Sequence, residues 1–321
     1  MILRSVYQRS LRDLVRVYRK SIRRPLFSAG FLVILVFLFL SQPSNGGNIS
    51  LLDQKDAPSL VAVNQEIIVA KPPPVPEKII NDDPEVTAQG ITVFDLSSHT
   101  FLFEKNGDER FLPASLTKIA TALIALKYCS LPDIVEVKNL ESDGSQMGLQ
   151  EGEKISVENL LYGLFLNSGN DAARVLADGC FGGDSAEINR SLGFLELKNT
   201  HLAGPTGLEE ENHYTSPRDL ALISAQVYQS PEIQHIVSTQ DKVVTSYDQK
   251  IWHSLTNLNP LLGKLQGVVG LKTGWTPKAG ECMVTVFQRM NRIILIVVLQ
   301  SQDREKDTQA LIDWTFRSFQ W

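Results

Sequence analysis

The chain has 321 residues, 43% of them hydrophobic, and a net charge of −5, which is ordinary for a globular protein. The charge is unevenly distributed: residues 1–24 hold eight basic residues and one acid, so that residues 25–321 sum to −12. An acidic body of this kind argues against nucleic acid as the main partner.

The first predicted element is a single transmembrane helix at residues 25–41. This stretch reads PLFSAGFLVILVFLFLS and contains no charge. A long basic segment precedes it and no small-x-small cleavage site follows, so a retained anchor is favoured over a cleaved signal peptide. With either, the basic segment stays in the cytoplasm and the rest is exported across the plasma membrane.

Residues 42–86 are rich in Pro, Asn, Asp and Gln and include the string PPPVP at 72–76. Such a composition predicts a flexible linker that holds a folded domain away from the membrane. We expect the compact domain itself to occupy residues 87–321.

Strands are predicted at both ends of this domain and helices in its middle. Two hairpins are expected at 91–104 and 282–299, and helices at 116–128, 159–165, from 171 onward, 217–228 and 303–319. Ser216 is the expected N-cap of the helix at 217–228. We predict an α+β fold, in which the two ends build one antiparallel sheet and helices pack on it.

Cys129, Cys180 and Cys282 allow one disulfide with one thiol left over. Their spacing suggests neither metal binding nor redox chemistry, so we interpret all three as buried thiols. The five histidines also lack metal-ligand spacing, and we expect neither a metal nor a cofactor.

Ser115 and Lys118 form the first chemical motif, Ser-x-x-Lys. If Ser115 opens a helix, Lys118 lies one turn further on the same face. A serine hydroxyl becomes a good nucleophile when a base takes its proton, and a buried lysine with a lowered pKa is such a base. Alone, however, this motif is more often an ordinary pair on a helix surface.

Ser168, Gly169 and Asn170 stand between two predicted helices. Gly169 permits a turn, the Ser168 hydroxyl is suited to relay a proton, and the Asn170 amide is suited to hold Lys118 or a substrate amide. A loop with helix-capping residues is the plainer interpretation of this string by itself.

Lys272, Thr273 and Gly274 follow a short β-like run. A lysine and a threonine are suited to bind a substrate carboxylate, and a glycine at a strand edge lets an extended peptide approach closely. The plainer interpretation is a strand end with an exposed lysine. The three motifs together, in this order, indicate acyl transfer through a serine ester.

At these residues the chain resembles the low-molecular-mass penicillin-binding proteins of the serine-type D-alanyl-D-alanine carboxypeptidase family. The resemblance covers about residues 85–321. It is carried by the segments 113–118, 160–162, 167–173, 199–201, 204–208, 213–216, 270–276 and 279–282. It implies a β-lactamase/penicillin-binding transpeptidase-like fold, an antiparallel sheet flanked by helices.

The resemblance also implies a reaction. Ser115 would be acylated by the penultimate residue of a peptidoglycan stem peptide ending in D-Ala-D-Ala, with release of the terminal D-Ala. Lys118 would be the base. Water would then hydrolyse the ester, and β-lactams would inhibit by acylating the same serine.

For the remaining site residues the resemblance implies supporting roles. Ser168 and Asn170 would assist proton transfer and hold the substrate, and Lys272 and Thr273 would bind its terminal carboxylate. The backbone N–H groups of Ser115 and Trp275 would form the oxyanion hole beside Gly274.

Three alternatives stay open on the sequence. A β-lactamase needs a carboxylate that activates the deacylating water, and no glutamate is marked for that role. A D,D-endopeptidase would use the same motifs. A catalytically silent wall-binding protein would be favoured by loss of a motif residue, and all are present.

One departure from the family's pattern concerns Pro260, where relatives often carry a basic residue.

Overall fold

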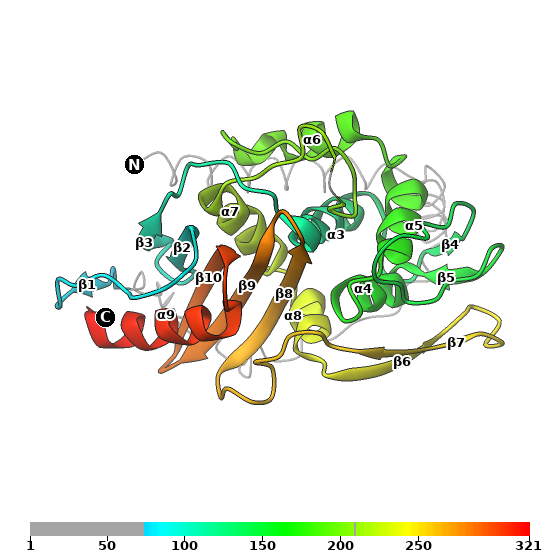
Figure 1. Ribbon diagram of the computed structural model, residues 1–321. Helices are drawn as coiled ribbons and strands as arrows, with labels where there is room; N and C mark the ends of the chain where they lie inside the picture. Colours follow the sequence, from blue (N-terminus) through cyan, green and yellow to red (C-terminus); the bar gives the residue numbers. More distant parts are fainter. Residues whose placement is uncertain (1–73, 209) are drawn as a thin grey trace, which may run out of the picture. The chain divides into compact units, whose positions relative to one another are not determined.

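The computed structural model describes residues 74–208 and 210–321 (Figure 1). The basic segment 1–24, the predicted anchor at 25–41 and the linker up to residue 73 lie outside the described residues. Within the residues that are described, no helix has the length and apolar character needed to cross a bilayer.

A five-stranded antiparallel sheet in the order β3-β2-β10-β9-β8 organises the fold (Figure 1). Its strands are β2 (Gly90–Asp95), β3 (Thr100–Lys105), β8 (Val268–Thr276), β9 (Gly280–Arg289) and β10 (Arg292–Ser301). Strand β10 pairs with β2, with Leu295 opposite Phe94, and so joins the two ends of the domain in one sheet. The predicted α+β architecture is confirmed.

Strand β10 shows why both faces of this sheet are covered. Along it, Ile294, Ile296 and Val298 belong to one buried cluster, while Leu295 and Val297 belong to another. Because side chains alternate across a strand, the two clusters lie on opposite faces. Helix α9 (Arg304–Ser318) contributes to the first cluster, and α3 (Thr117–Tyr128), α4 (Val157–Phe165), α5 (Asn170–Phe181) and α7 (Pro217–Val227) contribute to the second.

The middle of the chain supplies the remaining small elements. They are the 3-10 turns η1 (Ala114–Leu116) and η2 (Gly193–Leu195), the helices α6 (Ser185–Leu192) and α8 (Pro231–Ser238), and the strand pairs β4 (Ile134–Glu136) with β5 (Lys154–Ser156) and β6 (Asp241–Thr245) with β7 (Trp252–Thr256). Ser216 caps α7 as predicted, because its Oγ accepts a hydrogen bond from the backbone N–H of Asp219.

The folded part begins before the predicted boundary at residue 87. Strand β1 (Glu77–Lys78) pairs with β11 (Phe319–Gln320). Asp82 then accepts hydrogen bonds from the Trp314 indole and the Ser318 hydroxyl. The last residues that the sequence assigned to a flexible linker therefore pack against α9.

The interpretation of all three cysteines as free thiols was wrong for two of them. Cys129, directly after α3, and Cys180, near the end of α5, form a disulfide. The sequence allowed this pair but gave no distance between two helix ends that lie 51 residues apart. Cys282 is a free, fully buried thiol as predicted, and burial raises its pKa to about 11.

Candidate active site

The nucleophile turn, residues 114–118, combines a 3-10 turn with the start of α3. Ser115 lies in η1, directly after Ala114, whose φ of 48° is left-handed. Lys118 lies in the first turn of α3, and its Nζ is 3.0 Å from the Oγ of Ser115. The predicted placement of both groups on one face is confirmed.

The amine of Lys118 has two further partners. Its Nζ donates to the Oδ1 of Asn170 at 2.6 Å and to the carbonyl O of Thr206 at 2.7 Å. A neutral amine has two protons and one lone pair. If both protons go to these two acceptors, the lone pair faces the hydroxyl of Ser115.

Burial sets the charge of this amine. Lys118 is fully buried, and burial lowers its pKa to about 7, against the opposing effect of the carboxylates of Asp171 and Glu141. A neutral lysine base is therefore abundant at neutral pH, which is what general-base activation of a serine needs.

The second motif forms the turn between α4 and α5. Ser168 is buried with a left-handed φ of 56°, and Asn170 begins α5. The Nδ2 of Asn170 donates to the carbonyl O of Asp143, which leaves its Oδ1 oriented toward Lys118. Asp171 accepts from the backbone N–H groups of Met147, Gly148 and Leu149 and so fixes the loop that holds Asn170.

Ser168 is not joined to Lys118 directly. In the described part of the chain, its hydroxyl makes no hydrogen bond, whereas Asn170 contacts the amine. Ser168 thus lies in the same turn with a free hydroxyl.

The third motif lies on the edge strand β8, next to η1. A Cβ on Gly274 would lie 3.1 Å from the backbone N of Ser115 and 3.2 Å from the Cβ of Ala114. A glycine here lets the strand approach the nucleophile turn. The next residue, Trp275, is 59% exposed, so the strand edge beyond the contact is open to solvent.

Lys272 is almost completely buried, and its Nζ donates to the carbonyl O of Thr273. Burial lowers its pKa well below the ordinary lysine value, and the nearby charges of Lys118 and Arg304 lower it further. Because Coulomb repulsion is mutual, each of these two buried lysines disfavours the charged form of the other, and burial is the largest cause of both pKa shifts.

Arg304, at the start of α9, is a site residue that sequence reasoning missed. Its Nη1 donates to the carbonyl O of Gly274 at 3.1 Å, and its buried Nε has no hydrogen-bond partner among the described residues. The residue adds a positive charge beside the third motif. No motif spacing marks it, because it approaches through the packing of α9 on the sheet.

The comparisons with known proteins agree with this geometry. A family described as D-alanyl-D-alanine carboxypeptidase, peptidase S11, matches residues 77–303. The chain belongs to this family.

Two curated relatives within the D-alanyl-D-alanine carboxypeptidase family show how much of the chain is shared. DacF of Bacillus subtilis (strain 168) is 31% identical over 73% of this chain and 63% of its own length. DacA of Haemophilus influenzae is 33% identical over 74% of this chain and 64% of its own length. The chain thus spans less than two thirds of the length of these relatives.

A solved structure of the family supports the fold. The Streptomyces K15 DD-transpeptidase aligns with a TM-score of 0.68 and 30% identity, over 74% of this chain and 99% of that chain. The matching fold is the penicillin-binding transpeptidase-like α+β fold that the motifs implied.

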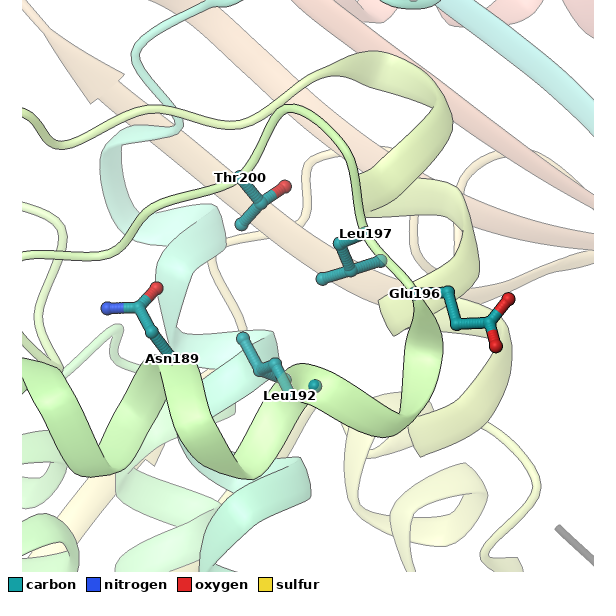
Figure 2. A pocket seen from close by; sticks show the side chains of 6 residues that line it. Asn189, Leu192, Glu196, Leu197 and Thr200 are labelled. Atoms are coloured by element: carbon teal, nitrogen blue, oxygen red, sulfur yellow. The ribbon is translucent and has the colours of Figure 1, made fainter.

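A separate small pocket lies away from the three motifs. Figure 2 shows its lining, which consists of Asn189, Leu192, Gly193, Glu196, Leu197 and Thr200. The amide of Asn189 bonds the backbone of Leu202, and the hydroxyl of Thr200 bonds Asp219, so both are already satisfied. The side chain of Glu196 points away from the others (Figure 2). None of the three motifs of this family contributes to it.

Proposed function

We propose that this chain is a serine D-alanyl-D-alanine carboxypeptidase that removes the terminal D-Ala from peptidoglycan stem peptides. One observation carries the proposal: the buried amine of Lys118 lies 3.0 Å from the Ser115 hydroxyl, with its other two partners already in place. Membership of the family supports the choice of substrate.

In the acylation step, the Ser115 Oγ attacks the carbonyl carbon of the penultimate D-Ala while its proton passes to the neutral amine of Lys118. The backbone N–H groups of Ser115 and Trp275 stabilise the oxyanion, at the point where β8 meets η1. The proton on Lys118 then passes through the Ser168 hydroxyl to the nitrogen of the terminal D-Ala as its C–N bond breaks, so that Lys118 is neutral and Ser168 is protonated again in the acyl-enzyme. Water then hydrolyses the ester and regenerates Ser115.

The substrate carboxylate binds to Lys272 and Thr273, with Arg304 beside them. An anion next to Lys272 favours the charged amine and reverses part of its pKa shift. Arg304 is held beside these two side chains by its hydrogen bond to the carbonyl of Gly274, and its guanidinium attracts the carboxylate.

We further propose that the protein is anchored in the plasma membrane by residues 25–41, with residues 1–24 in the cytoplasm and the catalytic domain outside. The uncharged stretch after a basic segment supports this orientation. The disulfide between Cys129 and Cys180 supports an oxidising compartment outside the cytoplasm.

The test combines covalent labelling with product detection. A fluorescent penicillin should label the wild-type chain and leave Ser115→Ala unlabelled. Free D-Ala should appear from a diacyl-D-Ala-D-Ala peptide with the wild type alone. Labelling without D-Ala release would rule out the carboxypeptidase assignment while keeping the penicillin-binding one.

A transpeptidase is the second candidate, because the Streptomyces K15 structure bears that name. Adding an amine acceptor to the same reaction distinguishes the two: a carboxypeptidase gives the hydrolysed peptide, and a transpeptidase gives the amine adduct. Cross-linked muropeptides test for D,D-endopeptidase activity. A short-lived penicilloyl ester would indicate a β-lactamase, and absence of labelling a silent wall-binding protein.

A further inference from the structure

The residue before the nucleophile is held in an unfavourable conformation. Ala114 has a φ of 48°, in the left-handed region that a residue with a Cβ rarely adopts. Its carbonyl accepts a hydrogen bond from the Oγ1 of Thr117 at 2.9 Å. On the other side Gly207 packs so closely on this carbonyl that a Cβ there would overlap it. Because Ser115 follows directly, whatever fixes the Ala114 carbonyl also fixes the nucleophile.

A histidine from another loop, His213, contacts the Thr117 hydroxyl that makes this hydrogen bond. The Nε2 of His213 lies 2.8 Å from the Oγ1 of Thr117, and its Nδ1 accepts from the backbone N–H of Ala203 at 3.1 Å. A backbone N–H can only donate, so Nδ1 carries no proton and Nε2 does. His213 therefore donates to Thr117, whose own proton is left for the carbonyl of Ala114. The hydrogen bonds therefore run in one direction, from His213 to Thr117 and from Thr117 to the carbonyl of Ala114.

We propose that His213 is a positioning residue for the reaction at Ser115: through Thr117 it fixes the Ala114 carbonyl and thereby the backbone turn that presents the nucleophile. The inference rests on the proposed acyl transfer at Ser115. His213 is 3% exposed and reaches no reacting atom, so its action passes through Thr117.

The same loop also contacts the base. The carbonyl of Thr206, between Ala203 and His213 in sequence, accepts from the amine of Lys118. His213 thus holds in register the segment that contacts Lys118 and the turn that carries Ser115. Burial, followed by the nearby His201, lowers the pKa of His213 to about 4, so the ring is neutral at neutral pH and keeps its Nδ1 acceptor.

The test compares two buried threonines of α3. Thr117 donates to Ala114, and Thr121, one turn later, donates to the carbonyl of Pro205 in the same loop as His213. Thr117→Val and Thr121→Val each remove one buried hydroxyl between this helix and its surroundings at nearly constant volume. The measurements are the acylation rate constant at saturating β-lactam, its apparent dissociation constant, and Tm.

We expect Thr117→Val to lower the acylation rate constant about tenfold or more with little change in the dissociation constant, since misplacing a nucleophile slows the chemical step. Thr121→Val should lower Tm about as much as Thr117→Val does, while its acylation rate constant stays within about twofold of the wild-type value. His213→Phe should behave like Thr117→Val, and His213→Gln, which keeps a donor toward Thr117, should recover part of the rate.

Equal rate losses in the two valine variants would overturn the positioning role, as would a His213→Phe protein that acylates at the wild-type rate. If the wild type itself is not acylated, the proposed function fails instead. The two failures are therefore distinguished in one experiment.

Discussion

At the scale of single residues, the site depends on keeping one lysine neutral in a crowded space. Lys118 loses its solvent entirely, and its two fixed acceptors, Asn170 and Thr206, are oxygen atoms that do not need a charged donor. The carboxylates of Asp171 and Glu141 raise the pKa of Lys118, but burial, which lowers this pKa, is the larger effect. The resulting pKa of Lys118 lies near neutral pH, and the fraction of neutral amine changes most steeply with pH around that pKa.

The pH dependence of acylation follows from this balance. The pKa of Lys118 is lowered to about 7, so the neutral base is present above that pH and is lost as the pH falls below it. The second-order rate constant for β-lactam acylation should rise about tenfold per pH unit below 7 and level off above it. Stopped-flow labelling from pH 5 to 9 measures the profile.

Lys118→Arg is the control, because arginine stays protonated across these pH values and cannot act as a base. It should show no rising limb and a much slower reaction. A wild-type profile that is flat between pH 5 and 8 would contradict the role given to Lys118.

The sequence predicted the site residues that belong to a catalytic motif. It missed those that act through a backbone carbonyl or that reach the site only through tertiary packing. Ser115, Lys118 and Asn170 were predicted together, and the structure brings them into contact. The carbonyl of Thr206 had no signal, because every residue has a carbonyl. Arg304 was missed because its position depends on how α9 packs against the sheet.

At the scale of elements, two helices carry the site between them. Helix α3 bears Lys118 in its first turn, and α5 begins at Asn170. Their first turns meet in the Lys118–Asn170 hydrogen bond, and the disulfide between Cys129 and Cys180 joins them near their other ends. The helices are thus fixed to each other at both ends, so the spacing of base and amide depends little on loop motion.

Removing the disulfide should therefore affect stability more than chemistry. Reduction of the wild type should lower the free energy of unfolding by about 4 kcal/mol, the scale that loop-closure entropy gives for cysteines 51 residues apart. Urea titrations with and without reductant measure it. The double variant Cys129→Ser/Cys180→Ser should start at the lower stability and show no response to reductant. A response in that variant would indicate another target of reduction.

Long, patterned elements were predicted well and short ones were not. Helices α3, α7 and α9 and the hairpins of the large sheet appear where the sequence placed them. Strands β4 and β5, of three residues each, were missed, since they are too short for a periodic pattern. The helix α8 also escaped, although Ser230 caps it and Pro231 opens it.

At the scale of the whole described domain, two carboxylates, the buried Asp307 and the half-exposed Asp82, join the first and last segments. Asp307 in α9 accepts hydrogen bonds from the backbone N–H groups of Thr87 and Ala88, before β2, and from the hydroxyl of Ser301, at the end of β10. Asp82 makes similar contacts with the end of α9. These contacts hold the segment before β2 against the end of β10 and against α9, the last helix of the domain.

Asp307→Asn should therefore lower global stability. The amide NH2 would face at least one backbone N–H that now donates to a carboxylate oxygen, and we expect a loss of about 2 kcal/mol in the free energy of unfolding. Glu305→Gln is the control, as it neutralises an exposed acid in the same helical turn and should change stability by less than about 0.5 kcal/mol. Similar losses in the two variants would show that charge, and not the buried contacts, matters.

The pairing of β1 with β11 has a topological consequence. Glu77 lies opposite Gln320, so the path of the backbone through the domain is nearly a closed ring. A short peptide joining these two strands could seal the ring, and new ends could be opened at the β9–β10 turn, where Met290 is 77% exposed. A circularly permuted chain of this kind would keep every contact of Ser115, Lys118 and Lys272, because none of the three motifs depends on which bond is left open.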